Sequence, residues 1–159
     1  MKLITIAAVG QNNELGQNND LIWRFPEDMK FFKDTTWGHK VISGRKTFES
    51  LPGLLKGRSH IVLTRKALEL PKEVEVYHSP DEFLQAYINT DEEIFNIGGA
   101  TIYEELLEYT DQLYLTEIEA EASADVYFPN FDKNDFTKEV LAKHENNGIK
   151  FNHVLYKRR

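Results

Sequence analysis

Residues 3–33 read LITIAAV, GQNNELGQNNDL and IWRFPEDMKFFK in succession, and this stretch decides the fold. Its opening run, Leu3–Val9, is apolar and partly β-branched, which is typical of a strand buried on both faces. Residues 10–21 are polar, with four Asn, two Gln and two Gly, and predict a long loop of the kind that forms lids and binding loops. Pro26, followed by two acidic residues, predicts a helix start, because proline fits the first helical position and acids favour the positive end of the dipole.

Alternation of strands and helices continues along the chain and gives way to strands after Asp111. Further strands are expected at Lys40–Ser43, His60–Thr64, Val74–Tyr77, Glu93–Ile97, Gln112–Ile118, Thr137–Ala142 and Ile149–Lys157. Further helices are expected within Gly44–Leu51, Pro80–Ile88 and Thr101–Tyr109. This order predicts a single α/β domain over residues 1–159, with a mostly parallel central sheet, an antiparallel C-terminal edge and helices on both faces. Ligands of such sheets bind at the carboxyl ends of the strands.

Composition restricts the classes of protein to which the chain could belong. With 41% hydrophobic residues, a chain of 159 residues can bury a core, which argues against disorder. The net charge of −7 argues against nucleic acid and membranes as partners, so an anionic ligand would need local basic clusters. Cysteine is absent, which excludes disulfides and thiolate metal sites and is compatible with the cytoplasm, where we expect the protein.

Two basic clusters follow predicted strands. Gly44–Thr47 opens a helix, where backbone N–H groups and the helix dipole attract phosphate, although solvated charges are an equal alternative. Thr64–Lys66 repeats the pattern at the end of another strand. Two such clusters in an acidic chain favour a phosphorylated ligand. The pair Gly98-Gly99 would let a backbone approach a ligand closely, but taken alone it favours a plain strand-to-helix turn.

Asp28 and Phe32 lie four residues apart and share a helix face. A carboxylate on an aromatic face is unfavourable unless a cationic or hydrogen-bonding group docks on it, so Asp28 is either a ligand anchor or an ordinary first-turn aspartate. The indole of Trp23 could orient a water or a ligand through its N–H, or it could be a core aromatic. Both alternatives stay open on these residues alone.

Several cofactor and metal motifs are missing. The chain contains no G-x-G-x-x-G fingerprint, P-loop or H-E-x-x-H sequence, and its histidines are scattered, so we expect no metal site. Ordinary surface or core roles are expected for four of the histidines, namely His39, His60, His144 and His153.

Together, these pieces resemble bacterial-type dihydrofolate reductases over nearly the whole chain. The matching motifs, in family order, are Ile4–Ala8, Leu15-Gly16, Trp23–Lys33, Val41–Ser50, Gly57-Arg58, Ile97–Tyr103, Leu113–Thr116 and Tyr127–Pro129. The resemblance implies NADPH-dependent reduction of 7,8-dihydrofolate to tetrahydrofolate, by hydride transfer to the pterin with protonation of the adjacent ring nitrogen. It also implies a cytoplasmic monomer of one-carbon metabolism and a target of antifolates.

The resemblance assigns the site residues as well. The catalytic residues would be Asp28, Trp23, Leu21 and Thr116, with Asp28 binding the pterin. The substrate-binding residues would be Ile6, Ala8, Asp28, Phe32, Leu51, Leu55, Arg58, Ile97 and Thr116, with Arg58 gripping the carboxylate of the glutamate tail. The cofactor-binding residues would be Ala8, Leu15, Gly16, Asn19, Gly44, Arg45, Lys46, Thr47, Leu63, Thr64, Arg65, Gly98, Gly99, Ala100, Thr101, Ile102 and Tyr103. The Gly98-Gly99 bond is a candidate for the family's non-proline cis peptide.

Two sequence departures and two alternative functions belong with this assignment. Ile22 replaces the family's usual proline before the tryptophan, and Val126 replaces the usual threonine after Asp125. A related pyrimidine reductase of riboflavin synthesis shares the fold, but Asp28 and Arg58 argue against it. A non-catalytic α/β binding module, such as a receiver-like domain, would require an acidic cluster where this chain has Gly10–Asn13.

Overall fold

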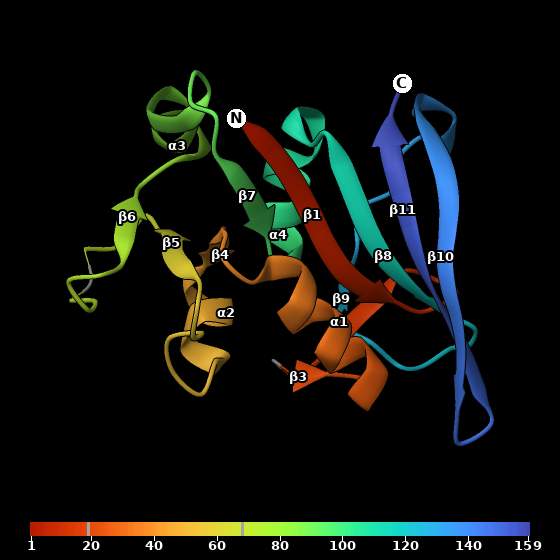
Figure 1. The fold of residues 1–159 in the computed structure, drawn as a ribbon. Coiled ribbons are helices and arrows are strands. Elements are labelled where there is room, and N and C mark those ends of the chain that lie inside the picture. Colours follow the sequence, from red (N-terminus) through yellow and green to blue (C-terminus); the bar gives the residue numbers. More distant parts are fainter. Residues whose placement is uncertain (19, 68) are drawn as a thin grey trace.

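A central, mostly parallel sheet dominates the structure, a computed structural model that describes residues 1–18, 20–67 and 69–159 (Figure 1). The strand order is β10-β11-β8-β1-β7-β4-β5-β6. The six strands from β8 to β6 in this order are parallel to one another. At one edge, β11 pairs antiparallel with both β8 and β10. The predicted fold class and the antiparallel C-terminal edge are confirmed.

The elements fall close to their predicted places. The strands of the main sheet are β1 (Lys2–Val9), β4 (Lys40–Gly44), β5 (Ser59–Leu63), β6 (Glu75–Tyr77), β7 (Glu93–Asn96), β8 (Gln112–Ile118), β10 (Phe136–Asn146) and β11 (Ile149–Arg158). A second small sheet contains β2 (Glu14–Gln17), β3 (Asp20–Leu21) and β9 (Val126–Tyr127). The helices are α1 (Pro26–Thr36), α2 (Arg45–Ser50), α3 (Pro80–Tyr87) and α4 (Ala100–Leu106), with 3₁₀ turns η1 (Leu107–Tyr109) and η2 (Lys133–Asp135).

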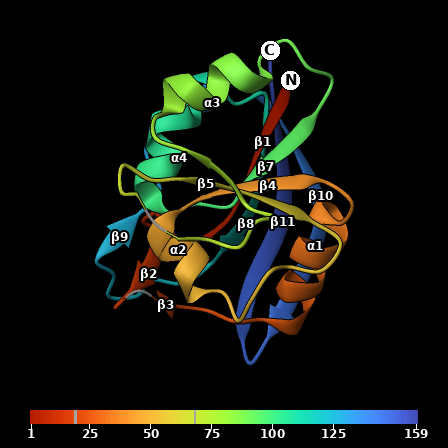
Figure 2. The same ribbon diagram turned by 90° about the vertical axis from the view of Figure 1, so that its left-hand side faces the viewer.

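Helices cover both faces of the sheet. Figure 2 shows α3 and α4 on one side and α1 on the other. On the first side, a core cluster joins Ile42 and Ile61 of the sheet to Phe83 of α3 and Leu106 of α4. On the α1 side, a second cluster contains Ile4, Ile6, Val41 and Phe95, with Phe31 and Phe32 of α1 packed against it. Burial on both faces explains why the inner strands are apolar at successive positions.

Local sequence sets the helix starts. Pro26 occupies the beginning of α1, and Phe25 O accepts from the amides of Asp28 and Met29 at 3.0 Å each. Ser79 caps α3 by accepting from the Glu82 amide at 3.1 Å, and Pro80 follows it at the first helical position. These are the starts that the sequence predicts.

The prediction of an unbroken loop over residues 10–21 is wrong. This segment contains β2 and β3, which pair with each other, and β2 also pairs with β9. Polar side chains do not prevent pairing, because the ladder uses backbone groups. Gly16 allows the close approach, since a Cβ there would lie 2.6 Å from Asp20 O.

Two other elements differ from their predicted bounds. The helix predicted over Thr101–Tyr109 ends at Leu106. The strand predicted at Thr137–Ala142 extends over Phe136–Asn146, because its hairpin with β11 continues past a bulge.

A buried carboxylate ties β2 to the rest of the protein. Glu14 is 1% exposed, its Oε1 accepts from the Asn12 amide at 2.6 Å, and its Oε2 accepts from the Ala122 amide at 2.9 Å. Burial alone would raise the pKa of Glu14, but hydrogen bonds from the amides of Ala122, Glu14 itself and Asn12 lower it. The carboxylate is therefore ionised and locks the second small sheet onto the loop after β8.

None of the helices in the described ranges is both long and apolar enough to cross a membrane.

Glu14→Gln should destabilise the protein. The amide keeps one acceptor oxygen but turns an NH2 group toward a backbone N–H, so one hydrogen bond to a charged group is lost, at about 1.5–3 kcal/mol. Urea unfolding at neutral pH measures the difference, with Glu121→Gln, at an exposed position nearby, as the matched control. Equal stability of the two variants would contradict the locking role.

Candidate active site

The carboxyl ends of β1, β4 and β7 meet at one point and carry several of the predicted site residues. The Gly44 amide donates to Gly98 O at 2.9 Å, and the Ile97 amide donates to Ile42 O at 2.9 Å. The hydroxyl of the buried Tyr103 donates to Ile6 O at 2.8 Å. These bonds bring Ile6, Gly44, Ile97, Gly98 and Tyr103 together, at the place where a parallel sheet binds its ligands.

The turn from β7 into α4 has a backbone that only glycine fits. The Gly98-Gly99 peptide is cis, as the family resemblance implied, and Gly98 has φ +99°. A Cβ on Gly98 would lie 2.8 Å from the Tyr103 ring. Asn96, 0% exposed, holds this turn: its Oδ1 accepts from the Gly98 amide at 3.1 Å and its Nδ2 donates to Ile102 O at 3.2 Å. The result is a rigid backbone surface at the start of α4.

Asp28 presents a carboxylate between α1 and the sheet. The Thr116 hydroxyl of β8 donates to Asp28 Oδ1 at 2.5 Å, and His153 Nε2 of β11 lies 3.1 Å from the same oxygen. No partner for Oδ2 occurs among the described residues. The Asp28 side chain is 22% exposed, and Phe31 and Phe32 lie further along its helix in the apolar cluster. One oxygen is thus held by protein, and the other remains for a ligand.

Leu21 and Trp23 differ in their surroundings. Trp23 packs against a cluster of Phe25, Ile118 and Phe151, with Ala8 beside it, and its ring lies close to Gly10, where an added Cβ would be 2.6 Å from the indole. Trp23 is only partly buried, and these contacts position its indole at the end of β1, which is compatible with either alternative. Leu21, in β3, is 56% exposed and makes no such contacts within the described residues.

A cavity of about 260 Å³ lies at the amino ends of β5 and β6, and Glu73 is among its lining residues. Its lining also includes Leu55, Arg58 and His60. The Arg58 guanidinium donates to Lys56 O at 3.0 Å and to Thr36 Oγ1 at 3.3 Å and lies 5.4 Å from the Trp37 ring centroid. No acidic side chain pairs with Arg58 in the described part of the chain, and burial lowers its pKa. A half-buried guanidinium without a carboxylate is suited to bind one.

His60 holds the loop that lines this cavity. The Leu55 amide donates to His60 Nε2 at 2.8 Å, so the imidazole is neutral and accepts. Burial, and secondly the charge of Arg58, hold the pKa of His60 below its ordinary value. The imidazole therefore keeps its acceptor lone pair near neutral pH.

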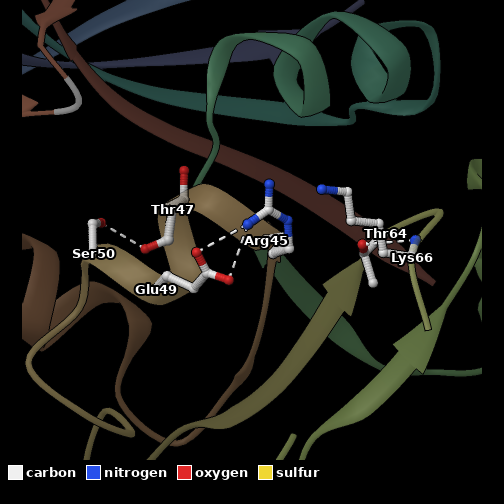
Figure 3. Close-up of polar contacts among 6 residues, drawn as sticks. All are labelled: Arg45, Thr47, Glu49, Ser50, Thr64 and Lys66. Atoms are coloured by element: carbon white, nitrogen blue, oxygen red, sulfur yellow. Dashed lines mark hydrogen bonds and ion pairs between the residues drawn. The ribbon is translucent and has the colours of Figure 1, made fainter. Parts of the chain in front are cut away.

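The two basic clusters face one another at the ends of β4 and β5. Figure 3 shows the Arg45 guanidinium and the Lys66 side chain extending toward each other. Glu49 accepts two bonds from Arg45 Nη1, at 3.0 and 3.1 Å, and Thr64 Oγ1 accepts from the Lys66 amide at 3.2 Å. Like charges that converge in this way leave room for an anion, with the Glu49 carboxylate at one side.

The remaining predicted cofactor residues surround these groups. Thr47 Oγ1 lies 3.3 Å from where a Cβ of Gly99 would be, which places α2 beside the glycine turn. Lys46 and Arg65 are exposed, as is Thr101, whereas Leu63 and Ile102 are buried in the core. Ala8, Leu15, Leu51 and Ala100 are half-buried, and Gly16 lies in β2. Asn19 lies outside the described residues. No group of three potential metal ligands occurs in the part of the chain that the structure describes.

Sequence reasoning missed the partners of four buried polar residues. Asn96, Glu14, His60 and His153 all have buried polar side chains with specific partners. The signal for three of them was a polar residue inside a predicted apolar strand: Asn96 in β7, His60 in β5 and His153 in β11. For Glu14, in a segment interpreted as a loop, the sequence offered no such signal.

The fold is that of an α/β protein whose parallel sheet brings the basic clusters and the turn at Gly98-Gly99 to the carboxyl ends of its strands. A family model, dihydrofolate reductase, matches residues 2–158. The chain is 36% identical over 157 residues to a dihydrofolate reductase of Bacillus subtilis, covering 97% of this chain and 93% of that protein. It is 34% identical over 161 residues to one of Staphylococcus haemolyticus, covering 99% and 96%. A solved dihydrofolate reductase from Enterococcus faecalis, complexed with NADP(H) and RAB-propyl, has a TM-score of 0.89 at 28% identity and coverage of 99% and 96%.

The chain belongs to the dihydrofolate reductase family. The resemblance inferred from the ordered motifs is confirmed, and the chain is an oxidoreductase of that family. The family match also decides against the non-catalytic binding module.

The stability of the protein should fall as the pH drops through the range in which His60 titrates. Its folded pKa is lowered, so the unfolded chain takes up a proton at a higher pH than the folded protein does. The stabilisation is complete above the ordinary histidine pKa of about 6.5 and is lost as the pH falls toward the lower folded value. His60→Gln keeps an acceptor for the Leu55 amide without titrating, so its unfolding free energy should change less between pH 7.5 and 5.5. Parallel urea-unfolding results for the two proteins would refute this.

Proposed function

We propose that this chain reduces 7,8-dihydrofolate to tetrahydrofolate with NADPH, and that Asp28 anchors the pterin. The observation that carries the proposal is the open oxygen, Oδ2, of a carboxylate whose other oxygen is bonded by Thr116 and His153. A carboxylate in an apolar site favours a cationic or strongly donating ligand beside it. The amino group and ring nitrogen of a pterin have this chemistry.

The surroundings of the basic clusters fit a phosphorylated dinucleotide. Arg45 and Lys66 would hold the 2′-phosphate, with Thr64 between them at the end of β5. The Gly98-Gly99 turn would cradle the pyrophosphate, because it lies at the start of α4 beside Thr47, whose Oγ1 is 3.3 Å from where a Cβ on Gly99 would be. When bound, NADPH supplies the hydride.

The cavity at Arg58 fits the glutamate tail of dihydrofolate. Arg58 lacks an acidic partner among the described residues, and Leu55 lines the same cavity. The guanidinium would pair with a tail carboxylate, and His60 would position the wall of the cavity through the Leu55 amide.

The residues perform catalysis by orientation and electrostatics. Asp28 fixes the pterin ring and stabilises positive charge on it, which favours protonation of the nitrogen next to the imine carbon. Ile6 and Ile97 would offer backbone carbonyls to the ring, and Phe32 would pack on its face. The β2–β3 hairpin, with Gly16 and Leu21, would close over the reacting rings and exclude water.

The proposal also covers the oligomeric state, the cellular location and the ligands of the protein. The protein acts as a single domain and a monomer in the cytoplasm, and its ligands are dihydrofolate and NADPH rather than nucleic acid or membrane. The net charge of −7 supports this, because such a protein repels polyanions and holds anions only at local basic clusters.

Arg45→Ala should weaken NADPH binding by about 10- to 150-fold, the effect of one lost hydrogen bond to a charged group. NADH lacks the 2′-phosphate, so its affinity should stay nearly unchanged. Fluorescence titration with each cofactor measures both values, and Lys72→Ala, which removes an exposed cation elsewhere, controls for net charge. Equal losses for NADPH and NADH would show that Arg45 does not meet the 2′-phosphate.

Asp28→Asn tests the reaction itself. The variant keeps the shape of the side chain but loses its charge, so turnover, followed by loss of NADPH absorbance on adding dihydrofolate, should fall by most of its value at neutral pH. Acid supplies protonated substrate from solution, so variant activity should climb steeply as the pH falls, and wild-type activity should not.

The outcome of the Asp28→Asn assay separates two roles. A variant as active as wild type at neutral pH would remove Asp28 from the mechanism. A variant that is inactive at every pH, while folded by circular dichroism, would restrict Asp28 to binding. Thr116→Val, which deletes the hydroxyl behind Asp28 without changing charge, should cause a smaller loss with an unchanged pH profile.

A further inference from the structure

Trp37 lies at the end of α1 and packs against the segment that carries Arg58. Its ring rests on Gly57, because a Cβ added to Gly57 would lie 2.7 Å from the nearest indole carbons. Gly57 has φ +79°, and its carbonyl oxygen accepts from the Gly38 amide at 2.8 Å. The Trp37 side chain is nevertheless 45% exposed, whereas tryptophan is largely buried on average. Core packing alone therefore does not account for an indole at this position.

The Arg58 guanidinium lies over this indole, with its Cζ 5.4 Å from the ring centroid. A cation over the face of a tryptophan is attracted by the negative face of the ring. Lys33 Nζ lies 5.8 Å from the same centroid, but an ammonium is a point charge, whereas a guanidinium is a plane with its donors in a fixed fork. The direction of the group therefore matters for Arg58 and not for Lys33.

The other contacts of Arg58 hold its guanidinium only in part. Its Nε donates to Lys56 O at 3.0 Å, and its Nη1 donates to Thr36 Oγ1 at 3.3 Å, which is long for such a bond. A guanidinium has five N–H donors, so three of them have no partner within the residues that the structure describes. Two parallel donors suit a carboxylate, and the indole supplies the orientation that the long bond to Thr36 does not.

Helix α1 separates this group from Asp28. Asp28 lies in the first turn of α1, and Trp37 follows its last residue. At about 1.5 Å of rise per residue, the two positions lie about 13 Å apart along the helix axis. The proposed substrate has a donor-rich ring at one end and a carboxylate tail at the other. One end of α1 thus presents an anion to the ring, and the other end supports a cation for the tail.

We propose that Trp37 is a positioning residue: its indole sets the direction of the Arg58 guanidinium, and Arg58 in turn binds the tail carboxylate. A guanidinium without this support would adopt several directions, and ordering it would weaken binding. Trp37 therefore makes the protein selective for dihydropterins that carry the tail over those that lack it. The inference rests on the proposed function, in which Arg58 holds the tail of dihydrofolate.

Steady-state kinetics with dihydrofolate and with 6-methyl-7,8-dihydropterin, which lacks the tail, tests the proposal. Trp37→Leu keeps an apolar side chain against Gly57 but removes the aromatic face. It should raise the KM for dihydrofolate about two- to fivefold, the effect of losing a cation–π contact at an exposed site. The kcat and the KM for the dihydropterin should stay unchanged. Trp37→Phe, which keeps an aromatic face, should be closer to wild type with dihydrofolate. An equal rise in KM for both substrates would show that Trp37 is only structural.

A double-mutant cycle separates the inference from the proposed function. Arg58→Leu should raise the KM for dihydrofolate far more than the KM for the dihydropterin. Adding Trp37→Leu to Arg58→Leu should cause no further rise, because Trp37 acts through Arg58. If Trp37→Leu raises the KM for dihydrofolate by the same factor with and without Arg58, the inference is refuted and the role of Arg58 stands. If Arg58→Leu affects both substrates alike, the proposed function fails at the tail, and the inference falls with it.

Discussion

The Asp28 carboxylate is an anion held against the apolar face of a sheet, and much of the site is arranged around it. Isolated, such a charge would be too costly to keep ionised. Thr116 and His153 offset part of this cost through Oδ1, and α1 contributes the positive end of its dipole, since Asp28 lies in the first turn. The charge is therefore stable without a ligand and is still incompletely satisfied. An oxygen without a protein partner is what our proposal assigns to the pterin.

The basic side chains show the same pattern with the opposite sign of charge, because some of them lack an oppositely charged partner in the protein. An acidic chain with net charge −7 concentrates cations where strands β4 and β5 end, and Arg58 has no acidic partner among the described residues. Glu49 moderates the first of these sites by pairing with Arg45. Arg58 precedes the start of β5, whereas Arg45 and Lys66 follow the ends of β4 and β5, so the two groups of cations lie at opposite ends of these strands.

Much of this arrangement follows from the sequence, for a physical reason. Strands such as Lys2–Val9 and helices with a proline at the start have local signals that tertiary contacts reinforce, and their predicted positions agree with the structure within a few residues. The small sheet of β2, β3 and β9 was missed because its strands are only two to four residues long, too short for a periodicity to mark them. His153 and Asn96 were missed because their partners, Asp28 and the Gly98 amide, are brought to them by the fold, and a buried polar side chain has no meaning until its partner is known.

Glu14 and Asp28 show how a structural carboxylate differs from a functional one. Both are acids close to the apolar interior, and neither has a lysine or arginine partner within the described residues. In Glu14 each oxygen accepts from a different backbone amide, so nothing is left for a ligand, and the side chain serves to lock β2 in place. In Asp28 both protein donors converge on Oδ1. The unequal use of the two oxygens costs stability, and a protein retains such a cost where a ligand makes the missing bond. The same criterion separates Arg58, which lacks an acidic partner, from Arg24, whose charge is already met by Asp20.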